Sequence, residues 1–164
     1  MSAAVVSQKA LAQRAFTVSL WRELSKKILV PVDGSRYMEE NIVYASKLAR
    51  ATESTLTFVH VVTLPVVAPP EIGIDPRPLE QAGLKILENA KNIARKEGAD
   101  SETRLGKAFG NAAQEILRTA EHESFDLIVI GAKGHSLLDK LLIGSVCETV
   151  MHHATCPVLV LHHR

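Results

Sequence analysis

Short apolar runs alternate along this chain with longer segments in which apolar residues recur every three or four positions. Predominantly apolar runs cover residues 27–32, 55–62, 126–130 and 157–161, and a more polar alternation covers residues 101–106. A short apolar run that breaks on glycine or another turn residue is typical of a buried parallel strand, whereas polar alternation indicates an edge strand. The pattern therefore predicts five strands, with the one at 101–106 at an edge.

Apolar residues at helical spacing predict four helices between these strands. Three helices cover residues 39–51, 79–97 and 145–153, and the fourth starts at Gly110-Asn111. Each helix has one apolar face that can pack on a sheet. Alternating strands and helices favour a parallel, doubly wound sheet with helices on both faces, and 164 residues suit one such α/β domain.

Five prolines punctuate residues 63–78, so neither a helix nor a strand is expected to extend far through this stretch. We interpret it as a surface loop. Loops of this length are often functional, and a flap over a ligand site is one role for it.

The first strand closes on Asp33-Gly34-Ser35 and leads into a helix. This places a turn at the carboxyl edge of the sheet, which is where open α/β folds bind ligands. Taken alone, Asp33 is typical of a turn or a helix cap.

Two glycine-containing segments follow the apolar run at 126–130. They are spaced as Gly131-x2-Gly134-x9-Gly144-Ser145, and Gly144-Ser145 opens a predicted helix. Glycine lets backbone N–H groups approach a ligand closely, and a helix start adds unpaired amides and a positive dipole end. Together they favour phosphate binding, although each glycine taken singly is more typical of an ordinary turn or helix start.

This spacing is similar to the nucleotide-binding signature of the universal stress protein family, and the resemblance extends from Lys26 to about His162. It implies a Rossmann-like sheet of strand order 3-2-1-4-5, with ATP, or AMP or ADP, as ligand, together with Mg²⁺. In that family the residues matching Asp33 and Val61 hold the adenosine, and backbone amides of the glycine segments hold the phosphates. The nucleotide-binding residues that we expect are Pro31, Val32, Asp33, Ser35, Val61, Ile130, Gly131, Gly134, His135, Gly144, Ser145 and Val146.

The resemblance also implies a homodimer, because family members commonly pair their C-terminal edge strand across a two-fold axis. In this chain that strand contains Val158–Leu161. A bare apolar edge strand is otherwise an aggregation hazard, so the physical argument agrees. The protein partner cannot be named from the sequence.

The sequence gives little support for a catalytic site or a metal site. Gly106–Gly110 lacks the Lys-Ser or Lys-Thr of a P-loop, Ser35 has no nucleophile-elbow context, and no Cys/His spacing matches a zinc site. We expect His60 to be a core or edge histidine and Lys133 to be a solvated loop residue. The favoured function is a nucleotide-responsive stress or signalling module. A slow ATPase or nucleotide-modifying enzyme, and a dimeric interaction module with little nucleotide affinity, remain as alternatives.

Charge divides the chain into two parts. The net charge of +1 gives no reason to expect nucleic acid as a partner, but residues 1–27 carry +5 − 1 = +4, which leaves −3 for the remainder. Residues 1–25 form an extension before the domain at 26–164, and three roles are open: a transit peptide, a docking helix or an inconsequential upstream start.

Two cysteines without a CxxC motif favour reduced thiols, and no apolar run approaches the ~18 residues of a membrane span. We expect a cytoplasmic protein, with organellar targeting by residues 1–25 left open.

Overall fold

The computed structural model of the chain describes residues 23, 25–65, 75–133 and 143–162. A five-stranded sheet runs through it in the order β3-β2-β1-β4-β5, and all neighbouring strands are parallel. The predicted fold class and strand order are therefore confirmed. The strands are β1 (Lys27–Pro31), β2 (Thr55–Leu64), β3 (Ser101–Phe109), β4 (Leu127–Gly131) and β5 (Val158–Leu161).

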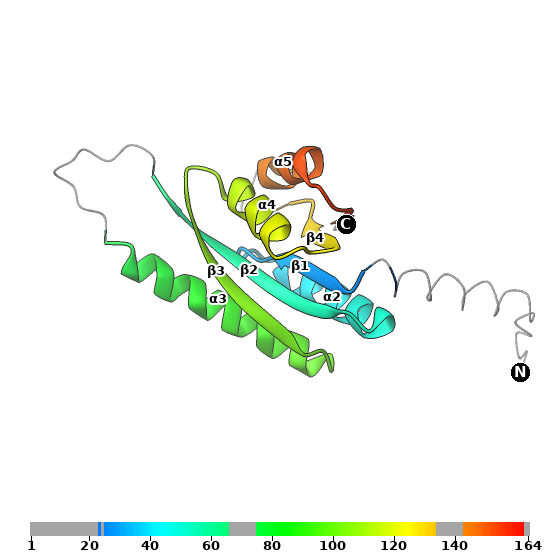
Figure 1. Cartoon of the computed structure of the whole chain (residues 1–164). Coiled ribbons are helices and arrows are strands. Elements are labelled where there is room, and N and C mark those ends of the chain that lie inside the picture. Colours follow the sequence, from blue (N-terminus) through cyan, green and yellow to red (C-terminus); the bar gives the residue numbers. More distant parts are fainter. Residues whose placement is uncertain (1–22, 24, 66–74, 134–142, 163–164) are drawn as a thin grey trace, which may run out of the picture.

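Helices cover both faces of the sheet (Figure 1). One face packs against α2 and α3, and the other against α4 and α5. These helices are α2 (Met38–Thr52), α3 (Arg77–Lys96), α4 (Ala112–His122) and α5 (Ser145–His153). The helix predicted at 145–153 has these same bounds, and the others differ from prediction by a few residues at their ends.

The central strand β1 supplies side chains to two hydrophobic clusters at once. Ile28 and Val30 join the cluster beneath α2 and α3, whereas Leu29 joins the cluster beneath α4 and α5. All three are fully buried, because successive side chains of a strand point to opposite faces. This two-sided burial explains why the central strands are continuous apolar runs.

Two strands extend beyond the rest of the sheet at their carboxyl ends. The β1–β2 register ends at Pro31↔Val59, but β2 and β3 continue to pair as far as Leu64↔Phe109. We expected these strands to stop at Val62 and Gly106, so the prediction placed both ends too early. The predicted loop at 63–78 is correspondingly shorter, because residues 63–64 belong to β2 and residues 77–78 to α3. Its suggested flap, residues 66–74, lies outside the described residues.

The rejected phosphate loop at 106–110 is part of β3 and the turn that follows it. Gly106 is buried within the strand, where an added Cβ would lie 2.7 Å from Cγ of Glu115 on α4. Gly110 turns the chain with a φ of 85°, and the Asn111 side chain then caps α4. The predicted turn into this helix is confirmed.

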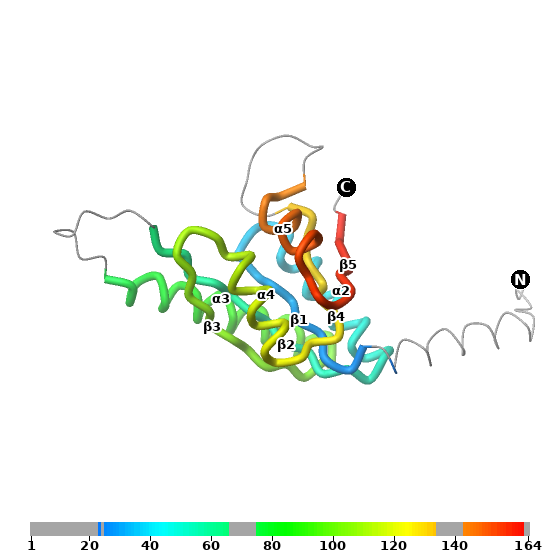
Figure 2. Tube along the Cα trace, turned by 45° about the horizontal axis from the view of Figure 1, so that its top comes forward, coloured from blue at the N-terminus to red at the C-terminus, as the bar shows by residue number. Residues whose placement is uncertain are grey.

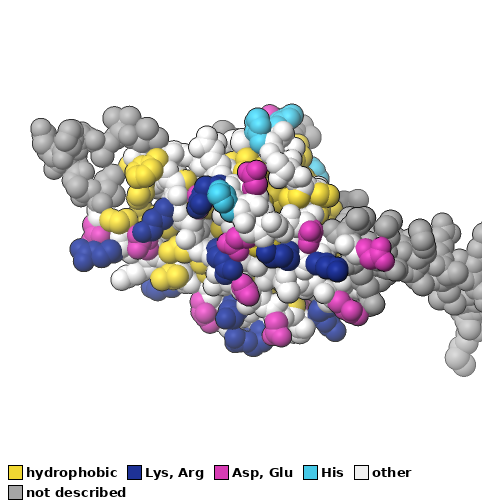
Figure 3. Space-filling model, viewed as in Figure 1, with side chains coloured by type: hydrophobic (Ala, Val, Ile, Leu, Met, Phe, Trp, Pro, Cys, Tyr) yellow, Lys and Arg dark blue, Asp and Glu magenta, His cyan; other side chains and the backbone are white. Residues whose placement is uncertain are grey.

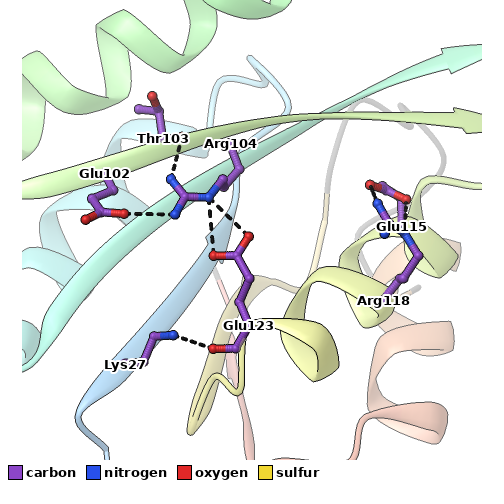
Figure 4. A network of polar contacts seen from close by, with 7 residues as sticks. All are labelled: Lys27, Glu102, Thr103, Arg104, Glu115, Arg118 and Glu123. Atoms are coloured by element: carbon purple, nitrogen blue, oxygen red, sulfur yellow. Dashed lines mark hydrogen bonds and ion pairs between the residues drawn. The ribbon is translucent and has the colours of Figure 1, made fainter.

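An ion pair ties β3 to the turn after α4, and a hydrogen bond ties the start of β1 to the same turn (Figure 4). Arg104 on β3 donates from Nε to both carboxylate oxygens of Glu123, at 3.1 and 3.2 Å, and from a terminal nitrogen to Glu102 at 2.9 Å. Lys27 Nζ donates to the backbone oxygen of Glu123 and lies 4.8 Å from the centroid of the Phe125 ring. These side chains are partly exposed, so each pair contributes at most about 1 kcal/mol.

Two phenylalanines give a matched test of the core. The Phe58 side chain is 0% exposed in the middle of β2, whereas Phe109 is 73% exposed at the end of β3. We expect Phe58→Ala to lower the free energy of unfolding by roughly 3–5 kcal/mol, because it opens a cavity, and Phe109→Ala to change it by less than about 0.5 kcal/mol. Urea titration of both variants checks this, and equal losses would contradict the placement of β2 at the centre of the core.

Gly83 on α3 gives a second test. A Cβ added there would lie 2.7 Å from Cδ2 of His60 and 2.8 Å from Cδ1 of Leu105. Alanine normally stabilises a helix interior relative to glycine by about 1 kcal/mol, but here we expect Gly83→Ala to destabilise the protein by about 1–3 kcal/mol through overpacking. Thermal unfolding is the measurement, with the exposed Gln81→Ala on the same helix as control. A higher Tm for Gly83→Ala would refute the contact.

Candidate functional site

A cavity of about 390 Å³ opens at the carboxyl ends of β1, β2 and β4. It lies where the strand order reverses, between β1 and β4, which is the usual ligand crevice of an open α/β sheet. Its volume falls in the range of small-molecule sites, roughly 300–1,000 Å³. Its walls are residues 31–33, 59–61, 130–133 and 144–147, together with Asn41, Thr63, Ala112 and Ile116.

The cavity exists because β1 ends while β2 continues beside it. Beyond Pro31, Val32 is still held against β2, since its N–H donates to the Val59 oxygen at 2.9 Å. The Val32 oxygen lies 2.8 Å from Nδ1 of His60. A carbonyl oxygen only accepts, so His60 carries its proton on Nδ1. His60 therefore helps to hold the end of β1 at the cavity wall.

Asp33 forms the turn that follows β1 and also lines the cavity. Its Oδ1 accepts a hydrogen bond from the Ser35 N–H at 2.9 Å, and Gly34 between them has a φ of 78°. The turn interpretation of Asp33 and its place in the ligand site are thus compatible. Ser35 is not among the lining residues, and it contributes through its backbone by fixing the aspartate.

The opposite wall joins the end of β4 to the start of α5. The Ala132 N–H donates to the Leu161 oxygen of β5 at 2.8 Å, and the Ala132 oxygen accepts from the Gly144 N–H at 2.8 Å. The first turn of α5 lines the cavity. Among the described residues no side chain caps this helix, whereas Asn111 caps α4 at 2.9 Å. Unpaired amides and a positive dipole end therefore make this wall suitable for an anion.

The structure gathers most of the predicted site residues around this one cavity. Ser35 lies behind Asp33 rather than in the wall, and Gly134 and His135 lie outside the described residues. The predicted residues that line the cavity are Pro31, Val32, Asp33, Val61, Ile130, Gly131, Gly144, Ser145 and Val146.

Asn41 on α2 is a lining residue that sequence reasoning missed. It is only 6% exposed and lies on the same buried helical stripe as Met38 and Ala45. The available signal was an amide side chain on the buried face of the helix, where the other polar residues are the smaller Ser46 and Thr52. Lys133, expected to be a solvated loop residue, is half-buried and also lines the cavity.

Cys147 lines the cavity in the first turn of α5 and is buried. Burial raises the pKa of the Cys147 thiol and that of Cys156, so both are protonated at neutral pH and are poor nucleophiles. Both cysteines are free, as predicted.

Metal-binding clusters are absent from the part of the chain that the structure describes: no three His, Cys, Asp or Glu side chains come together there. His152 and His153 are exposed in the last turn of α5, where Figure 3 shows histidine side chains at the top of the molecule. On the same face, basic and acidic side chains are interspersed.

No described helix is long and apolar enough to cross a membrane.

Comparison with known proteins agrees with this geometry. The profile of the universal stress protein family matches residues 25–162. The universal stress protein YxiE of Bacillus subtilis is 37% identical over 146 residues, which cover 82% of this chain and 97% of the relative.

Similar solved structures include complexes with adenine nucleotides. The universal stress protein of Archaeoglobus fulgidus in complex with dAMP has a TM-score of 0.62 and 26% identity, and the match covers 84% of this chain and 98% of that one. A universal stress protein in complex with cAMP has a TM-score of 0.64 and 25% identity, with 86% and 99% covered. From the profile match and its relatives, we conclude that the chain belongs to the universal stress protein family.

Proposed function

We propose that this protein binds ATP together with Mg²⁺ in the cavity and acts as a nucleotide-responsive stress or signalling module. One observation carries the proposal: two walls of different chemistry face the same cavity, at the point where the strand order reverses. One wall carries Asp33, and the other is the uncapped start of α5. Relatives that hold dAMP and cAMP support an adenine nucleotide as the class of ligand.

Each wall suits one end of such a ligand. We assign the adenosine to Asp33 and Val61 and the phosphates to the backbone amides of Ser145 and Val146 in the first turn of α5, with the Lys133 cation nearby. Mg²⁺ needs oxygen ligands and usually keeps several waters, so phosphate oxygens and the Ser145 hydroxyl fit it without a protein cage. When bound, it would neutralise part of the phosphate charge.

Rapid turnover is not part of the proposal. Of the side chains that line the cavity, Asp33 accepts a hydrogen bond from the Ser35 N–H, His60 turns its Nε2 edge toward Gly83 on α3, and Cys147 is protonated. The described residues therefore present no obvious activated base for water. Binding that alters a partner surface fits this arrangement better than hydrolysis does.

Calorimetric titration with ATP, ADP and AMP in the presence of Mg²⁺ tests the site. Gly144 has φ −67° and ψ 145°, which valine can adopt, so Gly144→Val fills space at the phosphate wall without backbone strain. We expect it to weaken ATP binding at least tenfold, about 1.4 kcal/mol.

Ala154→Val is the matched control, because Ala154 has nearly the same backbone angles, φ −66° and ψ 137°, at the other end of α5. Loss of binding in both variants would argue for a general disturbance of α5. If the wild-type protein binds no nucleotide and retains none on purification, the nucleotide-binding function is wrong. The alternative function, a dimeric interaction module, then takes its place. If the wild-type protein converts ATP to product and Gly144→Val does not, the alternative function, a slow ATPase, is favoured instead.

Dimerisation through β5 is the second part of the proposal. The four residues of β5 are all partly exposed, and β4 pairs with one side only (Figure 2). Within the described residues no strand covers its outer edge. Because the Pro157 and Leu161 oxygens face β4, the alternation of a parallel ladder directs the backbone of Val158 and Val160 outward. Those groups can pair with a second copy across a two-fold axis.

Val160→Pro removes one outward N–H while leaving the β4–β5 ladder intact, and Val160→Ala serves as control because it trims the side chain only. In a symmetric dimer the proline deletes two hydrogen bonds, so we expect an affinity loss of about 2 kcal/mol, roughly thirtyfold. Sedimentation equilibrium measures it. A wild-type monomer, or equal effects of both variants, would rule out this interface.

A further inference from the structure

Gly131, the first glycine of the spaced motif, does not need to be glycine for its backbone. Among the described residues only Gly34, Gly98 and Gly110 are glycines with a positive φ. Gly131 ends strand β4 in a conformation open to alanine. The backbone therefore does not require glycine at this position. A side chain is instead excluded because a neighbouring group occupies the place where its Cβ would lie.

The side chain of Asn41 occupies it. A Cβ added to Gly131 would lie 2.5 Å from Nδ2 of Asn41 and 3.4 Å from its Cγ, and 3.3 Å from the Lys133 oxygen. Atoms that close would have to move. Asn41 is 6% exposed and its backbone lies in the buried stripe of α2, so the amide can give way only by turning into the cavity that it lines.

This contact links the two walls of the cavity. Asn41 stands in the first turns of α2, which directly follow the Asp33 turn. Gly131 leads to Ala132, whose oxygen accepts from the Gly144 N–H at the start of α5 at 2.8 Å. A chain of contacts thus runs from the adenosine wall through Asn41 to the phosphate wall.

We infer that Gly131 lacks a side chain in order to admit the Asn41 amide, and that Asn41 is a positioning residue that sets the distance between the two walls. The inference rests on the proposed nucleotide site for its second half. A ligand with phosphates spans both walls, whereas a nucleoside touches only the first. Removing the Asn41 side chain should therefore lower the affinity for nucleotides more than the affinity for adenosine.

A competing explanation is that Gly131 is small so that the ligand can approach its backbone. The two explanations differ for the double variant. If Asn41 fills the space, Asn41→Ala makes room for the alanine of Gly131→Ala. If the ligand fills it, the second substitution restores nothing.

Thermal unfolding without ligand tests the contact. We expect Gly131→Ala to lower the Tm by roughly 5 °C, and the double variant Asn41→Ala/Gly131→Ala to unfold within about 2 °C of Asn41→Ala alone. As a control, Asn41→Ala should not rescue Gly106→Ala, where the added Cβ meets Glu115 on another helix. An unchanged Tm for Gly131→Ala, or no recovery in the double variant, would overturn the contact.

Calorimetry with ATP and with adenosine tests the positioning role. In Asn41→Ala we expect the ratio of ATP affinity to adenosine affinity to fall about tenfold, a ratio that a smaller folded fraction does not change. An unchanged ratio would overturn the positioning role even where the Tm recovers. If the wild-type protein binds neither ligand, the proposed function fails and the positioning role with it, while the Tm measurements still decide the Asn41–Gly131 contact.

Discussion

The pairing of β1 with β4 is the constraint on which the rest of this structure depends. The two strands meet at Ile28↔Leu127 and Leu29↔Ile128, far apart in the sequence, and both are buried on each face. Because they are parallel, their carboxyl ends lie side by side at the point where the strand order reverses. The Asp33 turn leaves one end and Gly131 leaves the other, so the cavity follows directly from this pair.

Unequal strand lengths give the cavity its third wall. β2 and β3 continue as a two-stranded ribbon after β1 has ended, and such a ribbon gains little stability alone. Here α3 packs closely on one of its faces, as the contact of Gly83 with His60 and Leu105 indicates. His60 in turn holds the Val32 oxygen. The ribbon, the helix and the end of β1 therefore support one another.

The sequence was informative wherever local chemistry decides the outcome. Apolar runs predicted four strands, a polar alternation predicted β3, and helical spacing predicted the helices, while the Gly144-Ser145 pair correctly marked the start of α5. Strand ends were harder, because Thr63 and Leu64 extend β2 only by pairing with β3, and nearby prolines argued for a loop. Asn41 was missed because its importance depends on Gly131, which lies far away in the sequence but next to it in space. No local pattern reports a contact of that kind.

The cavity is complete only once β5 is in place. Its first wall is made soon after residue 25, but its last depends on β5, since the Leu161 oxygen holds the Ala132 N–H. During synthesis from the N-terminus, β1 must wait for β4, and the loop closed by that pairing spans about a hundred residues. A shortened chain that stops before β5 lacks the acceptor that holds Ala132 and, through it, the start of α5. A ligand of this cavity would therefore stabilise finished molecules by mass action and leave truncated ones to proteolysis.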